Sequence, residues 1–578
     1  MFRAWCWMTC FATCVFAQIS GQVLDLVSGL PIEGALVTVQ ETHEQVVTDA
    51  SGAFALTDTG LNRVVVAAHK GHYHSALTLS APISGTMFRL ELVAIENDPG
   101  YTLWPPGDCG SCHPKQYDEW LGTPMSLAGF NTWVLDIYNG NGTAGGMGGF
   151  VYTRDSVHAG VNPNSECASC HQPQHWIENP MAALDDNLAM PTPAVMHGVS
   201  CDVCHKVADV NVANINYPGL FPGAATHIRP SDDQVLFGVL ADVDFDVPTA
   251  MRASYQPQMV AELCGLCHQD KNDPDDSHSF NGVISEPTYL EWLDSPYGDP
   301  QSVLYTTCVD CHMPPSIDNE VCGVVIPPPR NVERVRSHRI LGTTPNFLEN
   351  AVEMVVNTEI VGDQLQVQVD LANTLTGHHV PTGVTVRNMI LVVDAWLDGH
   401  DPLVSPLPEL GGQVVHDLGG IGDPAQGYFA GLPGKFFAKV NHDQNGNGPT
   451  FFTDATGITF DSRIPALAVD TTTYAFQLPT GNNLVHVRAR LIYRRAFRFL
   501  VDAKQWTVDG HGNPLEDVQG PDFGHLMEIY SESLQAGVAA PVPALNAWGV
   551  GFMTSLLAIG AIAVRRRFRA EPSKDPLP

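Results

Sequence analysis

Five short segments of the sequence place two cysteines and a histidine at one fixed spacing, Cys-x-x-Cys-His. Two thiols three residues apart can each form a thioether with one vinyl group of a porphyrin, and the next residue then offers an imidazole to the iron. One copy could equally be a redox dithiol or half of a zinc site, but five copies favour covalent attachment of five haem c groups. The predicted attachment residues are Cys109, Cys112, Cys167, Cys170, Cys201, Cys204, Cys264, Cys267, Cys308 and Cys311, and the predicted proximal iron ligands are His113, His171, His205, His268 and His312.

Residues 96–345 contain all five motifs in a sequence rich in Gly and Pro, with two Tyr-x-x-Trp segments. The segments Cys308–Pro314 and His197–His205 resemble the multihaem cytochrome c family that includes cytochrome c554. Together with motifs in the segment that follows, the resemblance spans about residues 105–505. It implies a loop-rich α-helical domain in which short helices and loops surround closely stacked haems and relay electrons between them.

Each iron has either a sixth ligand or an open position, and this decides between electron relay and catalysis. The resemblance implies four histidines as distal ligands. It also implies a methionine as a fifth candidate, because this sequence has Met125 at a position where the family often has a histidine. A second such position is Tyr297, and both side chains could instead simply pack. The candidate distal ligands are His158, His197, His338, His378 and Met125.

The cysteine count predicts no disulfide framework in the mature chain, although covalent haem attachment implies export. Ten of the 14 cysteines belong to the five motifs, three lie in the leader, and only Cys322 remains, which we interpret as a packed thiol. Residues 1–17 combine Arg3, an apolar stretch and the small-residue site Val15–Ala17, so the sequence predicts a secretory signal peptide.

Residues 18–95 alternate between apolar and polar residues, with turn residues between the alternating runs, which predicts an N-terminal β-sandwich. The pattern Gly-x-Val-x-Asp, Pro-Ile-x-Gly-Ala and Thr-Asp-x-x-Gly-x-Phe resembles the carboxypeptidase regulatory-like domain. This resemblance implies a structural or adhesive module.

Residues 346–535 change character again. Leu365–Leu371 alternates strictly, as a half-buried strand does, and Met389–Leu397 and Val485–Tyr493 are further candidate strands. The segment predicts a C-terminal β-sandwich. Its motifs are similar to the C-terminal β-domain of the same cytochromes.

Within this segment, the spacing Asp-x-Asn-x-Asn-Gly is that of a calcium-binding loop of the EF-hand type. The candidate Ca²⁺ ligands are Asp443, Asn445, Asn447 and Asp454. Aspartate at the twelfth position reaches less far than glutamate, and a polar loop at a hairpin tip is the alternative.

Residues 541–578 contain a Pro-rich start, an apolar run at Trp548–Val564 and the basic cluster Arg565–Arg569. The run predicts a C-terminal transmembrane helix. The layout also resembles bacterial sorting signals of the PEP-CTERM and IPTL-CTERM kind, in which the tail is removed. The expected location is the periplasm or cell surface, with the chain associated with the membrane through this tail unless the tail is processed.

The expected fold is thus multidomain: two β-sandwiches, a loop-rich α-helical multihaem domain between them, and a transmembrane helix. A net charge of −33 argues against nucleic acid and favours basic or metal-bearing redox partner proteins. The alternative is that an acidic surface simply keeps a secreted protein soluble. We expect an electron-transfer protein. The alternative is an oxidoreductase that acts on a small nitrogen or sulfur compound at one open haem, although the Cys-x-x-Cys-Lys motif of known pentahaem nitrite reductases is absent.

Overall fold

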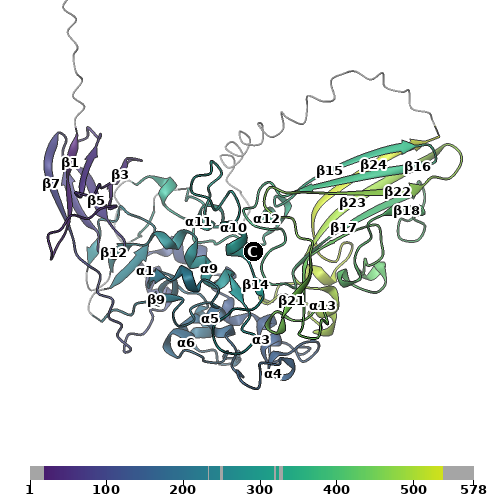
Figure 1. Cartoon of the computed structure of the whole chain (residues 1–578), viewed down its shortest axis with the longest axis horizontal. Coiled ribbons are helices and arrows are strands. Elements are labelled where there is room, and N and C mark those ends of the chain that lie inside the picture. The colour runs from purple at the N-terminus through teal and green to yellow at the C-terminus, as the bar shows by residue number, and fades with distance from the viewer. Residues whose placement is uncertain (1–17, 232–233, 248–250, 318–319, 324–329, 538–578) are drawn as a thin grey trace, which may run out of the picture.

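The computed structural model describes residues 18–231, 234–247, 251–317, 320–323 and 330–537. Three regions follow one another along the long axis of the molecule (Figure 1). The predicted signal peptide at 1–17 and the predicted tail at 541–578 lie outside the described residues.

The first region is built from two small sheets, in strand orders β4-β1-β7 and β3-β2-β5-β6. Alternating apolar side chains such as Val37, Val65 and Phe88 are fully buried between them. The strands are β1 (Ile19–Asp25), β2 (Leu36–Val39), β3 (Gln45–Val47), β4 (Ala53–Leu56), β5 (Arg63–Ala68), β6 (Ser75–Leu79) and β7 (Ile83–Leu90).

The central region consists of short helices, loops and three very small sheets. Three of its helices, α5, α8 and α11, begin at the first cysteine of a motif and end at its histidine. The helices are α1 (Pro106–Cys112), α2 (Pro114–Trp120), α3 (Thr132–Tyr138), α4 (Tyr152–Asp155), α5 (Cys167–His171), α6 (Pro173–Glu178), α7 (Pro193–His197), α8 (Cys201–His205), α9 (Glu262–His268), α10 (Thr288–Leu293), α11 (Cys308–His312) and α12 (Pro345–Glu349). The strands are β8 (Val207–Val210), β9 (Ala225–His227), β10 (Val235–Gly238), β11 (Asp246–Val247), β12 (Met251–Tyr255), β13 (Asp270–Lys271) and β14 (Ile284–Glu286).

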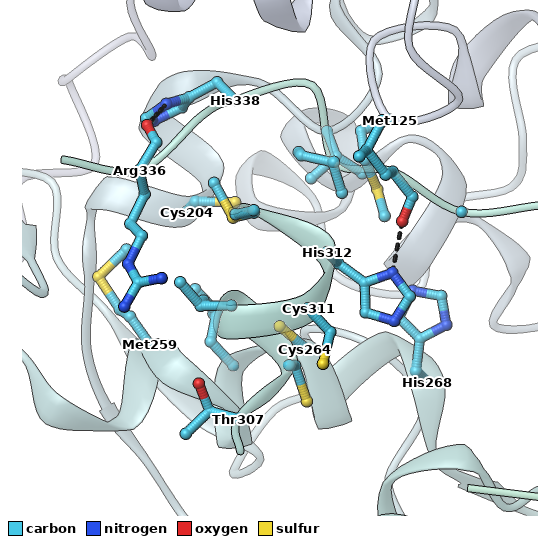
Figure 2. Close-up of a pocket in the computed structure, with 18 of the residues that line it drawn as sticks. Met125, Cys204, Met259, Cys264, His268, Thr307, Cys311, His312, Arg336 and His338 are labelled. Atoms are coloured by element: carbon cyan, nitrogen blue, oxygen red, sulfur yellow. Dashed lines mark hydrogen bonds between the residues drawn. The ribbon is translucent and has the colours of Figure 1, made fainter. Parts of the chain in front are cut away.

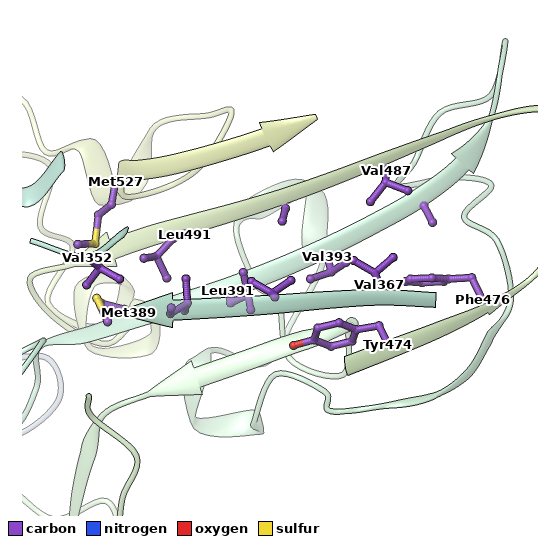
Figure 3. Close-up of a cluster of buried hydrophobic side chains, with 14 of the residues drawn as sticks. Val352, Val367, Met389, Leu391, Val393, Tyr474, Phe476, Val487, Leu491 and Met527 are labelled. Carbon is purple, nitrogen blue, oxygen red and sulfur yellow. The ribbon is translucent and has the colours of Figure 1, made fainter. Parts of the chain in front are cut away.

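The last region is a sandwich of two antiparallel four-stranded sheets, in orders β15-β16-β22-β18 and β19-β17-β23-β24. Its core lies between the sheets and includes Val367, Leu391 and Phe476 (Figure 3). The strands are β15 (Glu353–Val361), β16 (Gln364–Ala372), β17 (Asn388–Leu397), β18 (Glu409–Gly412), β19 (Gly434–Phe437), β22 (Val469–Gln477), β23 (Asn483–Arg494) and β24 (His525–Ala536), with the separate hairpin β20 (Lys439–His442) and β21 (Gly457–Asp461) and the helix α13 (Arg498–Ala503).

Contacts between distant segments join the three regions. The backbone N–H of His74 donates to the Ala253 carbonyl, 3.1 Å away, and so joins the first region to β12. At the other end, the rings of Trp133 and Trp506 stack with their centres 3.9 Å apart.

The predicted fold class is wrong in its helical parts. The chain is mostly β, with only 20% helix, and no helix of the central region as described exceeds seven residues. Because the motifs need only one helical turn each to present two thiols and an imidazole, this region is built mainly from loops. The predicted transmembrane helix is not found: in the described part of the chain, no helix has the length and apolar character needed to cross a bilayer.

Candidate haem-binding cavity

One continuous cavity of about 2470 Å³ runs through the central region. Residues of all five Cys-x-x-Cys-His motifs line it, together with apolar side chains such as Trp120 and Trp292. Pockets that hold a single small ligand are typically about 300–1,000 Å³, so this cavity has room for several. Part of it is seen in Figure 2, where cysteines and histidines from separate segments surround the same space.

Cysteines of different motifs touch one another across this cavity. The thiols of Cys109 and Cys201 lie close enough to interact, which raises the pKa of Cys109, and Cys267 raises the pKa of Cys170 in the same way. Cys264 likewise raises the pKa of Cys308. The fold therefore places the first motif beside the third, and the fourth beside both the second and the fifth.

Hydrogen bonds to Nδ1 orient the rings of the motif histidines. The Nδ1 atom of His205 lies 2.6 Å from the Phe237 carbonyl oxygen, and His113 and His312 make the same contact with the carbonyls of Val321 and Leu341. The Nδ1 atom of His268 instead lies 3.2 Å from the Glu286 carboxylate. Fixing Nδ1 in this way leaves Nε2 to bind a metal, as in most histidine-ligated metal sites.

Burial favours the neutral, ligating form of several of these rings. It lowers the pKa of His171 and of His312 to about 4. For His268, burial lowers the pKa, but the hydrogen bond and the charge of Glu286 outweigh it and raise the pKa above the ordinary value. The pKa of His268 is therefore shifted in the opposite direction to those of His171 and His312.

Two predicted distal histidines face motif histidines at a distance suited to a shared iron. The ring centres of His205 and His338 are 6.2 Å apart, and those of His312 and His378 are 6.4 Å apart. Two imidazoles on opposite sides of one metal ion, each at a bond length of about 2 Å, have ring centres roughly 6 Å apart. The Nδ1 atoms of His338 and His378 also contact carbonyl oxygens, so both have a free Nε2 (Figure 2 for His338).

The other predicted distal residues do not face a motif histidine in this way. The Nδ1 atoms of His158 and His197 contact Asp276 and Gln174 at 3.0 and 3.1 Å, which again leaves Nε2 free, but no described motif histidine faces either ring at the distance above. Met125 lines the cavity.

Tyr297 also lines the cavity, but its hydroxyl donates to the Thr374 carbonyl, 2.9 Å away. This bond ties the phenol to the backbone, so the tyrosine packs at the cavity wall.

The predicted calcium site finds no support. The Asp443 carboxylate accepts hydrogen bonds from the backbone N–H groups of Asn445 and Asn447, both at 2.8 Å. Asp454 turns elsewhere and accepts a hydrogen bond from Ser156. Across the described residues, no cluster of three or more His, Cys, Asp or Glu side chains could hold a metal ion by itself.

Sequence reasoning missed Glu286. It lies 18 positions after its partner His268, on the two-stranded sheet β13–β14. No motif marks it, and its role becomes visible only when the two strands pair.

The donor set fits haem c: paired thiols, an imidazole with a free Nε2 after each pair, and a largely apolar cavity. Each motif supplies two thioether positions and a proximal ligand from one helical turn.

No family model matches the chain, and no curated protein matches it. Among solved structures, the chain is similar to a penta-haem cytochrome c552 from Thermochromatium tepidum, with 19% sequence identity and a TM-score of 0.50 over 74% of this chain and 97% of that one. A PapD-like domain of human CEP192 also matches, at 10% identity over 34% of this chain and 89% of that one, but its TM-score of 0.13 carries no argument. The regulatory-like resemblance of the first region and the sorting tail stay predictions. The first likeness shows that the chain has a multihaem cytochrome-like fold.

Proposed function

We propose that the chain is an exported c-type cytochrome that holds five haems and carries electrons between redox partner proteins. The observation that carries the proposal is the single cavity that all five motifs line, with cysteines of neighbouring motifs in contact. A separate pocket for each motif would suit five independent sites, whereas one shared cavity suits a relay. The similarity to a penta-haem cytochrome c552 supports the same function.

In this proposal the protein holds the haems, orients their histidine ligands and shields them from water. When bound, haem iron supplies a reversible one-electron change. The thiols anchor each group, the Nδ1 hydrogen bonds fix each imidazole, and buried side chains such as Leu266 and Val309 exclude water. Export is part of the proposal because thioether attachment takes place outside the cytoplasm and residues 1–17 have the pattern of a signal peptide.

A second candidate function is favoured by one observation. Within the described residues, no histidine ring faces His113, His171 or His268 at the spacing seen for His205 and His338. An iron at one of these three histidines could keep an open position, as an oxidoreductase for a small nitrogen or sulfur compound needs.

The test is the haem content and spin state of the full chain produced in a host that attaches haem c. The intact mass and the haem absorbance should give five haems per chain, and electron paramagnetic resonance of the oxidised protein should show low-spin iron. Fewer than five haems would overturn the pentahaem proposal. A large high-spin signal that nitrite, hydroxylamine or cyanide changes would replace the relay by the oxidoreductase.

A further inference from the structure

The fourth motif differs from the others in what its histidine touches. The Nδ1 atoms of His113, His205 and His312 meet backbone carbonyls, and the ring of His171 meets the backbone of Ala128. Among these five, only His268 makes a hydrogen bond with a carboxylate, Oε1 of Glu286 at 3.2 Å, although the charge of Glu286 also acts on His171.

Local structure explains how this carboxylate reaches the ring. Helix α9 ends at His268, and strand β13 begins at Asp270. Strand β14 returns antiparallel to it with Glu286 opposite Asp270, which places the carboxylate next to the end of α9.

The strand that carries Glu286 is also held from the C-terminal sandwich region. Lys439, on β20, donates a hydrogen bond to the carbonyl of Ile284 at the start of β14. The Glu286 side chain is 17% exposed and the His268 side chain 45%, so the carboxylate is the more buried partner of this contact. The position of the carboxylate is therefore fixed both by its own strand and by a contact from the C-terminal region.

A carboxylate acceptor changes the imidazole more than a carbonyl does. It attracts the Nδ1 proton more strongly, because charge-assisted hydrogen bonds are about twice as strong as neutral ones. The opposite nitrogen then becomes a more basic ligand, which stabilises the more positive oxidation state of the metal. Hydrogen bonding around the axial ligand is one of the ways in which a protein sets the potential of a haem.

The fourth motif also has a special position, because its two cysteines contact two different motifs. Cys267 touches Cys170 of the second motif, and Cys264 touches Cys308 of the fifth. We propose that Glu286 is a positioning residue that makes His268 the most basic of the five proximal imidazoles and so gives the haem at this junction the lowest reduction potential of the five. The proposal rests on the proposed function, since it requires haem at the motif.

The test uses the full holoprotein and the variant Glu286→Gln, which keeps an acceptor oxygen but removes the charge. Spectroelectrochemical titration should show the lowest of the five midpoint potentials shifted upward. The near-infrared magnetic circular dichroism of the oxidised protein, which reports on axial ligand basicity, should shift for the same haem. The matched control is Glu333→Gln, which removes the same charge from a side chain that is 64% exposed and should leave both measurements as in the wild type.

A second variant is tested in case Glu286→Gln does not assemble with five haems. Glu286→Asp keeps the charge but withdraws the oxygen by one methylene, so it should give a smaller upward shift. Titrations that superimpose on the wild type in whichever variant retains five haems would overturn the inference, as would a downward shift. Failure of the proposed function looks different, because the wild-type chain itself would then contain fewer than five haems.

Discussion

At the scale of residues, the hydrogen bond on Nδ1 is the feature shared by the candidate ligands. His158, His197, His338 and His378 each have an acceptor at Nδ1, as do the motif histidines for which this contact is resolved. A histidine held in this way presents Nε2 in one direction, whereas a freely rotating surface ring does not. This hydrogen bond therefore distinguishes a histidine that is oriented to bind iron from one that merely has an imidazole ring.

Replacing His338 should open one iron. His338 faces His205 across 6.2 Å, so His338→Ala is expected to remove the sixth ligand from one of five haems. About one fifth of the low-spin signal in electron paramagnetic resonance should become high-spin, with the matching change in the visible spectrum. His486→Ala is the control, because that ring, on β23, is bound to Ser533 of β24 and to Asp398 and is not among the described residues that line the cavity. A spectrum unchanged by His338→Ala would exclude this residue as a ligand.

The predictions of the thiols and the proximal imidazoles follow from fixed spacings in the sequence, and the prediction of the distal candidates follows from a family resemblance. It could not pair His338 with His205 or His378 with His312, because each pair is separated by more than 60 residues and meets only in the folded chain. Glu286 was missed although it lies only 18 positions after His268, because the two meet only when β13 and β14 pair. A carboxylate in a loop-rich region carries no signal until its neighbours are known.

At the scale of elements, long strands were predicted better than short ones. The alternation at Leu365–Leu371 corresponds to strand β16, in which alternate side chains are buried. The strands β11, β13 and β14 have only two or three residues, too few for a period of two to be recognised. They form because neighbouring segments are brought together around the cavity, so their stability comes from tertiary contacts.

Helix α10 is fastened to the C-terminal sandwich region by a buried ion pair. Nη1 of Arg463 lies 2.5 Å from Oε1 of Glu291, and the two side chains are 5% and 6% exposed. Arg463→Met should leave the Glu291 carboxylate buried without its cation. Breaking a buried pair from one side typically costs about 3–5 kcal/mol, so the midpoint of chemical denaturation should fall clearly.

The control for this experiment is a more exposed pair within the sandwich. Lys435 and Asp470 form an ion pair whose side chains are 20% and 22% exposed. Lys435→Met should cost about 0–1 kcal/mol, as more exposed pairs do. Equal losses of stability in the two variants would contradict a special role for Arg463 in joining the regions.

At the scale of the whole molecule, the cavity-bearing region lies between two β-rich regions (Figure 1). The contacts that join them, such as the stack of Trp133 on Trp506 and the bond from His74 to Ala253, link residues that are far apart in the sequence. Such contacts cannot be read from one sequence, because periodicity and spacing report only on local structure. Composition and periodicity predict a succession of regions along the chain, but they carry no information on how those regions pack.

The charge of the whole chain leads to a prediction about partners. With 62 acidic and 29 basic residues, the net charge is −33. A field of this size speeds the approach of an oppositely charged protein by a factor of about 10–10³ at low salt. Raising the ionic strength from 0.01 to 0.15 M shortens the screening length from about 30 to about 8 Å. Electron exchange with a basic cytochrome should therefore slow steeply over this range.

The electron-transfer rate is measured by stopped flow with the basic cytochrome and with an acidic flavoprotein of similar potential. Comparing the two partners distinguishes the effect of charge on association from the effect of the redox chemistry. The rate with the acidic protein should rise with salt, because screening removes a repulsion, while the rate with the basic one falls. A common salt dependence for both would show that the net charge does not govern the encounter. Opposite slopes would place partner selection in the long-range field of the acidic surface, because electrostatic complementarity acts mainly on the association rate.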